Sequence, residues 1–277
     1  MTRFVLCADD FAMTEHVSRA IVTLAEAGRL SATGAMTNRP HWRIWSREIA
    51  FHARTMDIGV HLNLTCAAPL SAMPRLAPGG DLPSLSTIIR ASLVSGAARA
   101  EIAVEIARQL DAFEQVAGRR PDFVDGHQHV HAMPGVRGLV LAELVRRYPH
   151  ARPYLRDPVD RVGAIRERGV SVGKALTIAG LATGFGAAAR SCGFAVNDGF
   201  SGVSPFDPAR DFSADMARFL IRPGSRHLVM CHPGHVDDEL MRLDPVVETR
   251  PQEFATLLAG ALPDGWAVAR FGDLKAS

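Results

Sequence analysis

The chain has 277 residues, and its 31 Lys and Arg against 29 Asp and Glu give a formal net charge of +2 with neutral histidines. Charges of both signs are interspersed along the chain, whereas nucleic-acid and anionic-membrane partners select a concentrated basic face. With 47% hydrophobic and 22% charged residues, the composition is that of a globular protein. We therefore expect neither a nucleic acid nor a membrane as a partner.

The apolar runs are only a few residues long, far below the roughly 20 that span a bilayer, so no transmembrane helix is expected. The first apolar run reaches Asp9 and Asp10 too soon for the apolar region of a signal peptide. The cysteines are far apart and form no C-x-x-C pair; they are Cys7, Cys66, Cys192 and Cys231. A reduced, cytoplasmic protein is the expectation.

Short β-rich runs alternate with helical periodicity along the chain, which predicts a parallel sheet with helices outside. Strands are expected at Arg3–Ala8, Ser31–Met36, Asp57–Leu62, Asp122–Asp125, Pro153–Arg156, Phe194–Val196, His227–Cys231 and Trp266–Arg270. Helices are expected from a Thr14 cap to Gly28 and at Ala97–Val116, Gly135–Arg147 and Pro251–Leu262. The segments Cys66–Pro83 and Gly199–Asp211 read as long loops beside a site.

Eight strands with intervening helices predict an α/β fold in which a single domain, residues 1–277, forms a closed and irregular (β/α)-barrel. In such a barrel the catalytic groups lie where the strands end, because the loops converge there. The polar residues follow this rule, since Asp9, His61, Asp125 and His232 all lie at or just after predicted strands.

Asp9 and Asp10 are adjacent carboxylates directly after an apolar strand. Burial there raises the pKa of a carboxyl group unless a cation or hydrogen-bond donors offset the desolvation, so a positive group is expected nearby. Neighbouring residues point in different directions, and one carboxylate can bind a metal while the other faces the substrate as a base. The alternative is that one of them merely caps the helix beginning near Thr14.

The segment Asp125-Gly126-His127-Gln128-His129-Val130-His131 carries three histidines at alternate positions, which share one face if the chain is extended. Neutral imidazole is the commonest metal-ligand side chain, and a catalytic zinc site takes three protein ligands plus a water. The spacing leaves open which histidine binds, and a set of surface or hydrogen-bonding histidines is the alternative.

His61 lies on the face of its strand opposite Val60 and Leu62. A lone histidine there is more often a satisfied core residue, but its place at a strand end favours a site. Asp10, His61 and His127 together match a two-histidine, one-carboxylate metal site with open positions.

His232 follows the strand His227–Cys231 and precedes a Pro-Gly turn. Its imidazole suits the donation of a proton to a leaving group. His235 lies three residues further into the turn and is expected to be solvated.

Four motifs in order resemble the YdjC-like, or ChbG-like, family of carbohydrate deacetylases along nearly the whole chain. They are Ala8-Asp9-Asp10-Phe11, Gly59-Val60-His61, Gly118-Arg119-Arg120-Pro121 leading into Asp125–His131, and Cys231-His232-Pro233-Gly234. The resemblance implies a metal-dependent deacetylase of N-acetylated sugars such as chitooligosaccharides, on a distorted, TIM-like (β/α)-barrel similar to that of the polysaccharide deacetylases.

The resemblance also implies roles for individual residues. Asp10, His61 and His127 would hold a divalent metal, Asp9 would be the general base, His232 the acid, and Arg156 would orient Asp9. Two imidazoles and a carboxylate suit Zn²⁺, whereas Mg²⁺ is the ion associated with the family. The chain departs from the family pattern at Ala12, where Gly is usual, and at Gly126 and Gln128, where Ser and His are more frequent.

The expected partner is a small carbohydrate, and a homo-oligomer stays open. Trp42 and Trp45, three apart on an expected helix, are assigned to core packing and not to a sugar platform. Two other functions compete with deacetylation. A metal-dependent phosphoesterase or amidohydrolase barrel commonly carries an H-x-H pair on its first strand, but this first strand ends in Asp9-Asp10. A non-catalytic sugar- or metal-binding relative is preferred only if Asp9 and His232 are remote from the metal.

Overall fold

In the computed structural model, which describes residues 1–260 and 262–275, a parallel sheet forms the centre of the molecule. Its strands follow the order β5-β4-β3-β2-β1-β7-β6, and β8 pairs with β1 beside this path. Every ladder among the described strands is parallel, as the alternation of strands and helices predicts. The strands are β1 Thr2–Phe11, β2 Ala32–Ala35, β3 Asp57–Leu62, β4 Phe123–Gly126, β5 Tyr154–Leu155, β6 Gly199–Ser201, β7 His227–Cys231 and β8 Trp266–Val268.

The sheet curls into a distorted barrel, which confirms the predicted α/β barrel class. Its two ends approach each other at β5 and at the segment before β6, where Leu155 and Val196 form an isolated parallel bridge. The β8 strand pairs instead with the first residues of β1, so it lies outside the ring of strands. The barrel is therefore built from β1 to β7, and not from all eight expected strands.

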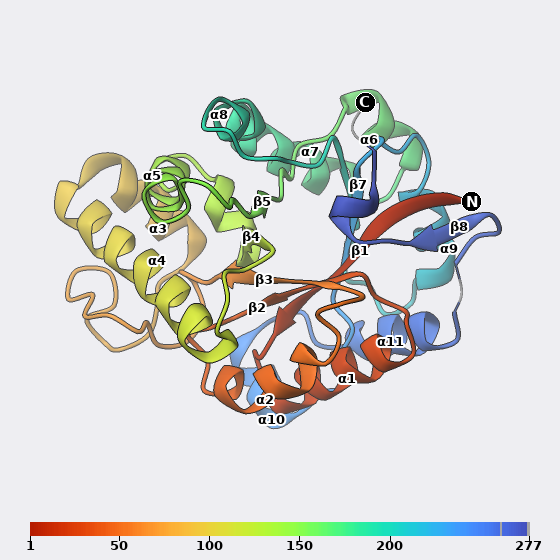
Figure 1. Ribbon diagram of the computed structural model, residues 1–277, viewed down its shortest axis with the longest axis horizontal. Coiled ribbons are helices and arrows are strands. Elements are labelled where there is room, and N and C mark those ends of the chain that lie inside the picture. The colour runs from red at the N-terminus through yellow and green to blue at the C-terminus, as the bar shows by residue number, and fades with distance from the viewer. Residues whose placement is uncertain (261, 276–277) are drawn as a thin grey trace.

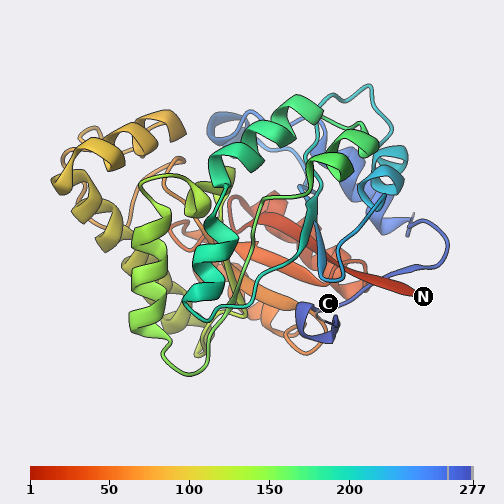
Figure 2. The ribbon, with the colours of Figure 1, turned by 90° about the horizontal axis from the view of Figure 1, so that it is seen from above.

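Helices cover the outside of the sheet. In Figure 1, α1, α2 and α11 lie side by side along one side of it, and α4 and α5 lie against each other at another. Figure 2 shows α3 and the start of α4 at the side of the molecule opposite the N-terminus. The helices are α1 Glu15–Glu26, α2 His41–Ala50, α3 Leu85–Val94, α4 Gly96–Ala117, α5 Arg137–Arg147, α6 Val162–Arg168, α7 Val172–Ala182, α8 Phe185–Ser191, α9 Phe212–Phe219, α10 Asp238–Leu243 and α11 Arg250–Leu258, with short 3-10 turns η1 His127–Ala132 and η2 Phe271–Asp273.

Alternate residues of β1 enter two different cores, because successive side chains of a strand point to opposite faces. Phe4 and Leu6 pack into the larger core beneath the helices, whereas Val5 and Cys7 pack into a smaller core inside the barrel. All of these side chains are fully buried, which explains why β1 reads as a continuous apolar run. A stack of rings fills the inner core near the strand starts: Phe123, Tyr154 and Phe271.

Two predictions around β6 are wrong. No strand forms at Phe194–Val196, and the segment Gly199–Asp211, expected to be a loop, begins with a strand. The strand β6 is Gly199–Ser201, whereas only Val196 of the earlier run forms a bridge. The side chain of Asn197 replaces ladder pairing there, since its Oδ1 accepts from the backbone N–H of Asp157 at 2.7 Å and its Nδ2 donates to the carbonyl of Asp157 at 2.8 Å. The expected helix Pro251–Leu262 ends at Leu258, and its residue 261 lies outside the described residues.

The expectation that no apolar segment reaches membrane-spanning length is wrong for Val172–Ser191. Within the described residues, this one segment is long and apolar enough to cross a membrane, judged by length and composition only. Its mean hydropathy is 1.3, and 28% of it is buried. In the fold it is divided into α7 and α8 by Thr183 and Gly184, and Gly184 has a φ of 87°. The many Ala and Gly residues of this segment conceal the apolar run in the sequence.

Candidate active site and metal centre

A cleft of about 450 Å³ opens at the carboxyl ends of the strands. It is lined by Asp9 and Asp10 from β1, His61 from β3, His127 after β4 and His232 after β7. These positions are far apart in the chain and come together because all the strands run parallel. The predicted Arg156 follows β5 and is fully buried behind the cleft lining.

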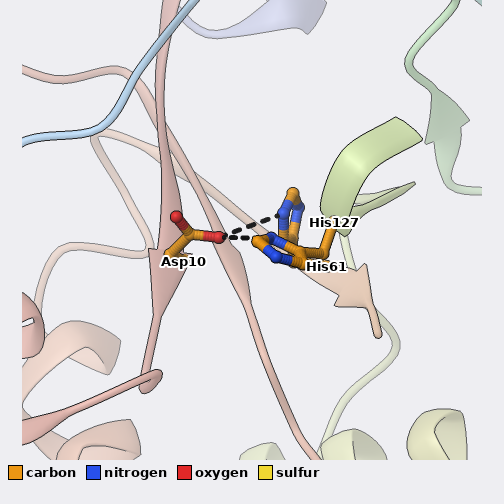
Figure 3. Close-up of side chains that lie close together, drawn as sticks. All are labelled: Asp10, His61 and His127. Carbon is orange, nitrogen blue, oxygen red and sulfur yellow. Dashed lines mark hydrogen bonds and ion pairs between the residues drawn. The ribbon is translucent and has the colours of Figure 1, made fainter. Parts of the chain in front are cut away.

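Asp10, His61 and His127 converge on one point (Figure 3). Asp10 Oδ1 lies 3.0 Å from His127 Nδ1 and 3.4 Å from His61 Nε2. One potential ligand atom from each residue lies within 4.8 Å of the other two. All three side chains are buried, so their donor atoms are held in place before any ion arrives. The geometry therefore fits one divalent cation held by two nitrogens and one oxygen.

A break in the β1–β2 ladder presents Asp10 to this point. The register between the two strands shifts between Ala8 and Phe11, and Asp10 and Ala12 have φ values of 67° and 69°. A bulge of this kind re-aims a side chain at the end of a strand. The left-handed conformation of Ala12 also explains why glycine suits that position, because a Cβ atom there costs about 1 to 2 kcal/mol.

Helix capping does not occupy the two carboxylates. Thr14 is the N-cap of α1, and its hydroxyl accepts from the backbone N–H of Val17 at 3.2 Å. The alternative in which Asp9 or Asp10 caps this helix is therefore wrong, and both side chains are left for the cleft.

His61 is oriented by a second carboxylate on the neighbouring strand. His61 and Asp125 are register partners in the β3–β4 ladder, and His61 Nδ1 lies 2.7 Å from Asp125 Oδ1. Burial alone lowers the pKa of His61, but the carboxylates of Asp125 and Asp9 outweigh it and raise the pKa to about 10. A carboxylate on the distal nitrogen is the usual support of a metal-binding histidine. Gly34 on β2 leaves room for the pair, since a Cβ atom there would lie 3.1 Å from His61 Cβ.

The three alternating histidines do not share one face, because the chain leaves the extended conformation directly after β4. His127–Ala132 forms η1, and Gln128 and His129 have φ values of 53° and 58°. The rings consequently diverge. His127 points to Asp10, His129 lies edge-on to Phe200, and His131 Nε2 lies 2.7 Å from the carbonyl oxygen of Arg156.

Asp9 is held by Arg156, as the resemblance implies. The guanidinium donates to both carboxylate oxygens of Asp9, at 2.6 and 2.5 Å, and forms an ion pair with Asp125 at 2.6 Å. Burial raises the pKa of Asp9, but the Arg156 charge and its hydrogen bonds outweigh burial and lower it. The buried carboxylate therefore remains charged and fixed in orientation beside the cation-binding point.

Sequence reasoning missed Arg250 and Asp244. Arg250 begins α11, is fully buried, and donates to Asp10 Oδ2 at 2.6 Å. Despite burial, the charges of Arg250 and His127 hold the pKa of Asp10 well below its usual range. Asp244 lines the cleft, with Oδ2 3.6 Å from His127 Nε2. Neither residue follows a strand, so no local pattern marks them in the sequence.

His232 lines the cleft, and its ring lies edge-on to Phe206 with a centroid distance of 5.2 Å. Its backbone N–H donates to Glu253 Oε2 at 2.6 Å. Burial lowers the pKa of the His232 imidazole to about 4 and raises that of the Glu253 carboxyl to about 7. His235 does not line the cleft, and it is half-buried against Phe254 and not fully solvated as expected.

The fold is similar to a crystal structure from Enterococcus faecalis V583 described as a candidate cellobiose-phosphate cleavage protein. The TM-score is 0.70 at 22% identity, and the match covers 98% of each chain. The sequence is 31% identical to a carbohydrate deacetylase of Geobacillus stearothermophilus over 91% of this chain and 88% of that protein. It is also 32% identical to a chitooligosaccharide deacetylase of an Enterobacter species, strain 638, over 52% of this chain and 56% of that protein.

A family model described as "YdjC-like protein" matches residues 3–266, which include Asp9, Asp10, His61, His127 and His232. Both the extent of that match and the near full-length likeness to the Geobacillus protein agree with the four motifs. The chain is therefore a member of the YdjC-like protein family.

Proposed function

We propose that this protein is a carbohydrate deacetylase that hydrolyses the N-acetyl group of an acetamido sugar with the help of a divalent cation. The relatives named carbohydrate deacetylase and chitooligosaccharide deacetylase support the reaction class. One observation carries the proposal. The carboxylate of Asp9, fixed by Arg156, lies in the same cleft as the Asp10, His61 and His127 cluster and the imidazole of His232.

The donor set supports a cation at Asp10, His61 and His127. Two imidazole nitrogens and a carboxylate oxygen suit Zn²⁺ or Co²⁺, whereas Mg²⁺ prefers oxygen ligands. When bound, such a cation polarises a carbonyl group and lowers the pKa of water. Arg250 on Asp10 and Asp125 on His61 keep the ligand atoms oriented toward the shared point.

The residues of this chain supply the proton transfers that amide hydrolysis requires. Asp9 accepts a proton from the attacking water, and its ion pair with Arg156 keeps it charged and oriented until that step. His232 donates a proton to the departing sugar nitrogen. Its imidazole is neutral at pH 7 in the free protein, because burial lowers its pKa to about 4. The imidazole therefore first takes up the proton that Asp9 has accepted from the water and then passes it to the nitrogen, so that the one proton released by the water balances the one gained by the amine.

The placement of Asp9 and His232 disfavours the non-catalytic alternative, since both line the cleft that contains the cation cluster. A phosphoesterase is disfavoured because, among the residues that the structure describes, Lys174 is the one Lys or Arg that lines the cleft, and phosphoryl transfer calls for several positive charges. We further propose a reducing cytoplasmic setting, in keeping with four free cysteines.

Acetate release tests the proposal directly. The protein is incubated with N-acetylglucosamine, N,N′-diacetylchitobiose and, as a contrasting substrate, a phosphate monoester, and the metal content of the same preparation is measured. We expect acetate from at least one acetamido sugar, in proportion to bound cation, and no phosphate release. Phosphate release without acetate release would overturn the proposal in favour of a phosphoesterase. If the protein binds the sugar but releases neither acetate nor phosphate, the proposal is overturned in favour of a binding protein.

A further inference from the structure

His127, like His61, has a buried carboxylate beside the nitrogen that points away from the cation-binding point. For His61 this carboxylate is Asp125, at 2.7 Å from Nδ1. For His127 it is Asp244, whose Oδ2 lies 3.6 Å from Nε2. That separation is an ion-pair distance, slightly longer than a direct hydrogen bond. Both imidazoles of the cation cluster therefore have an acidic side chain behind them.

The two imidazoles present different nitrogens to Asp10 (Figure 3). His61 Nε2 lies 3.4 Å from Asp10 Oδ1, and its Nδ1 faces Asp125. In His127 the order is reversed, because Nδ1 lies 3.0 Å from the same oxygen and Nε2 faces Asp244. An imidazole nitrogen that binds a cation carries no proton, so the proton of the neutral ring lies on the other nitrogen. For His127 that nitrogen is Nε2.

The carboxylate of Asp244 is held in place at the end of α10. The backbone N–H of Asp244 donates to the carbonyl oxygen of Leu240 at 3.0 Å, and Asp244 Oδ1 accepts from the backbone N–H of Val246 at 2.5 Å. The residue is only 6% exposed. Because Oδ1 is engaged within its own turn, Oδ2 is the oxygen that faces His127.

Arg250 connects this turn to the cation ligand Asp10. Its Nε donates to the carbonyl oxygen of Val246 at 2.6 Å, and its Nη2 donates to Asp10 Oδ2 at 2.6 Å. The same Nη2 lies 3.7 Å from Asp244 Oδ2. One fully buried guanidinium thus pairs with both carboxylates, which fixes the position of Asp244 relative to Asp10.

We propose that Asp244 is a positioning residue of the cation centre. Its Oδ2 accepts the Nε2–H of His127 and fixes the tautomer in which Nδ1 is free to bind the cation, as Asp125 does for His61 with the two nitrogens exchanged. This inference rests on the cation centre of the proposed function. The alternative is a direct bond from Asp244 to the cation, since Asp244 also lines the cleft.

Co²⁺ titration followed by ligand-field absorption tests this role. We expect Asp244→Ala to lower the affinity for Co²⁺ by about 10- to 100-fold, because His127 loses the acceptor for its Nε2–H. Asp244→Asn should lower the affinity less, since the amide oxygen can still accept that hydrogen bond. The affinity of Asp244→Ala remaining within about twofold of the wild type would overturn the proposal.

Asp237→Ala is the matched control, because Asp237 is the N-cap at the other end of α10. Its Oδ1 accepts from the backbone N–H of Leu240 at 2.6 Å, and it is not among the residues that line the cleft. The variant therefore loosens the same helix and is expected to keep the wild-type affinity for Co²⁺. Equal losses of affinity in Asp237→Ala and Asp244→Ala would attribute the effect to the helix and overturn the role of Asp244.

The tautomer of His127 gives a readout that a merely structural role would not change. In nitrogen NMR spectra of the Zn²⁺-loaded protein with isotope-labelled histidines, we expect the proton of His127 on Nε2, and we expect Asp244→Ala to shift that signal. A proton on Nδ1 would overturn the proposal. Co²⁺ absorption bands that change position at saturation in Asp244→Ala would also overturn it, in favour of a direct bond to the cation.

Neither the Co²⁺ titration nor the NMR spectrum depends on acetate release, so the two proposals can fail separately. The expected loss of Co²⁺ affinity in Asp244→Ala, in a protein that releases no acetate, would support the role of Asp244 and contradict the deacetylase function. Acetate release with unchanged Co²⁺ affinity in Asp244→Ala would do the reverse.

Discussion

Asp9 and Asp10 are neighbours in sequence, yet each is paired with a different arginine. Arg156 holds both oxygens of Asp9, whereas Arg250 holds one oxygen of Asp10 and leaves the other facing His61 and His127. The sequence predicted that a positive group must accompany two buried carboxylates, because desolvation otherwise neutralises them. It could suggest Arg156 only through the family resemblance, and it gave no sign of Arg250, whose position depends on how α11 docks.

Replacing Asp9 by Asn separates proton transfer from cation binding. Asp9→Asn keeps the size of the side chain but cannot accept a proton, so we expect the acetate-release rate to fall by about 10²- to 10⁴-fold while bound cation per chain is unchanged. Asp160→Asn is the matched control, since Asp160 forms a buried pair with Arg168 and does not line the catalytic cleft. Full activity in Asp9→Asn would remove Asp9 from the reaction.

Glu253 makes stability depend on pH. Burial raises its pKa to about 7 in the folded protein, above the usual range, so the folded state binds its proton more tightly than the unfolded chain. Its contribution is therefore present at low pH and is lost as the pH rises toward and past 7. Glu253→Gln has no charge to bury, and its amide oxygen can still accept the N–H of His232.

We expect Glu253→Gln to raise the free energy of unfolding relative to the wild type by about 2 to 3 kcal/mol at pH 8 and to change it little at pH 4. Urea unfolding at the two pH values measures this difference, and the comparison with the wild type removes the contributions of all other titrating groups. A variant that is equally destabilised at both pH values would contradict the assigned burial of charge.

At the scale of elements, strands with two buried faces were predicted well. The bounds of β3 and β7 agree with the expected ranges, because their apolar runs stop abruptly at polar residues. The β6 strand was misplaced because Asn197 substitutes side-chain hydrogen bonds for ladder pairing. The left-handed backbone conformation of Gln128 and His129 could not be predicted either, since neither residue is glycine. The alternating histidines are equally compatible with an extended chain.

Gly34 on β2 tests the support of His61 from a neighbouring element. A Cβ atom at Gly34 would lie 3.2 Å from both Asp125 Oδ1 and His61 Nδ1, so Gly34→Ala must displace this pair by a few tenths of an ångström. We expect cation affinity to fall by about 10- to 100-fold, measured by Co²⁺ titration. Gly138→Ala on α5 is the control, because a Cβ atom there meets nothing within 4 Å. Equal affinity in both variants would show that the pair tolerates the shift.

For the whole molecule, the parallel barrel is what turns scattered sequence motifs into a site. The predicted site residues lie near or just after the carboxyl ends of β1, β3, β4, β5 and β7, and the curled sheet brings these ends to one cleft. The sequence could predict this convergence from the fold class alone. It could not predict that Leu85, Ile178, Phe206 and Val246 also line the cleft, because these residues belong to helices and loops whose packing no strand pattern encodes.

Titration with Co²⁺ tests the central claim, that Asp10, His61 and His127 jointly hold one cation. The account predicts that the wild-type protein binds one Co²⁺ per chain with visible ligand-field absorption, and that acetate release rises in proportion to that signal. The double variant His61→Ala with His127→Ala, its folding checked by circular dichroism, should bind none at the same concentrations. One cation bound to the folded double variant with wild-type affinity would contradict the account.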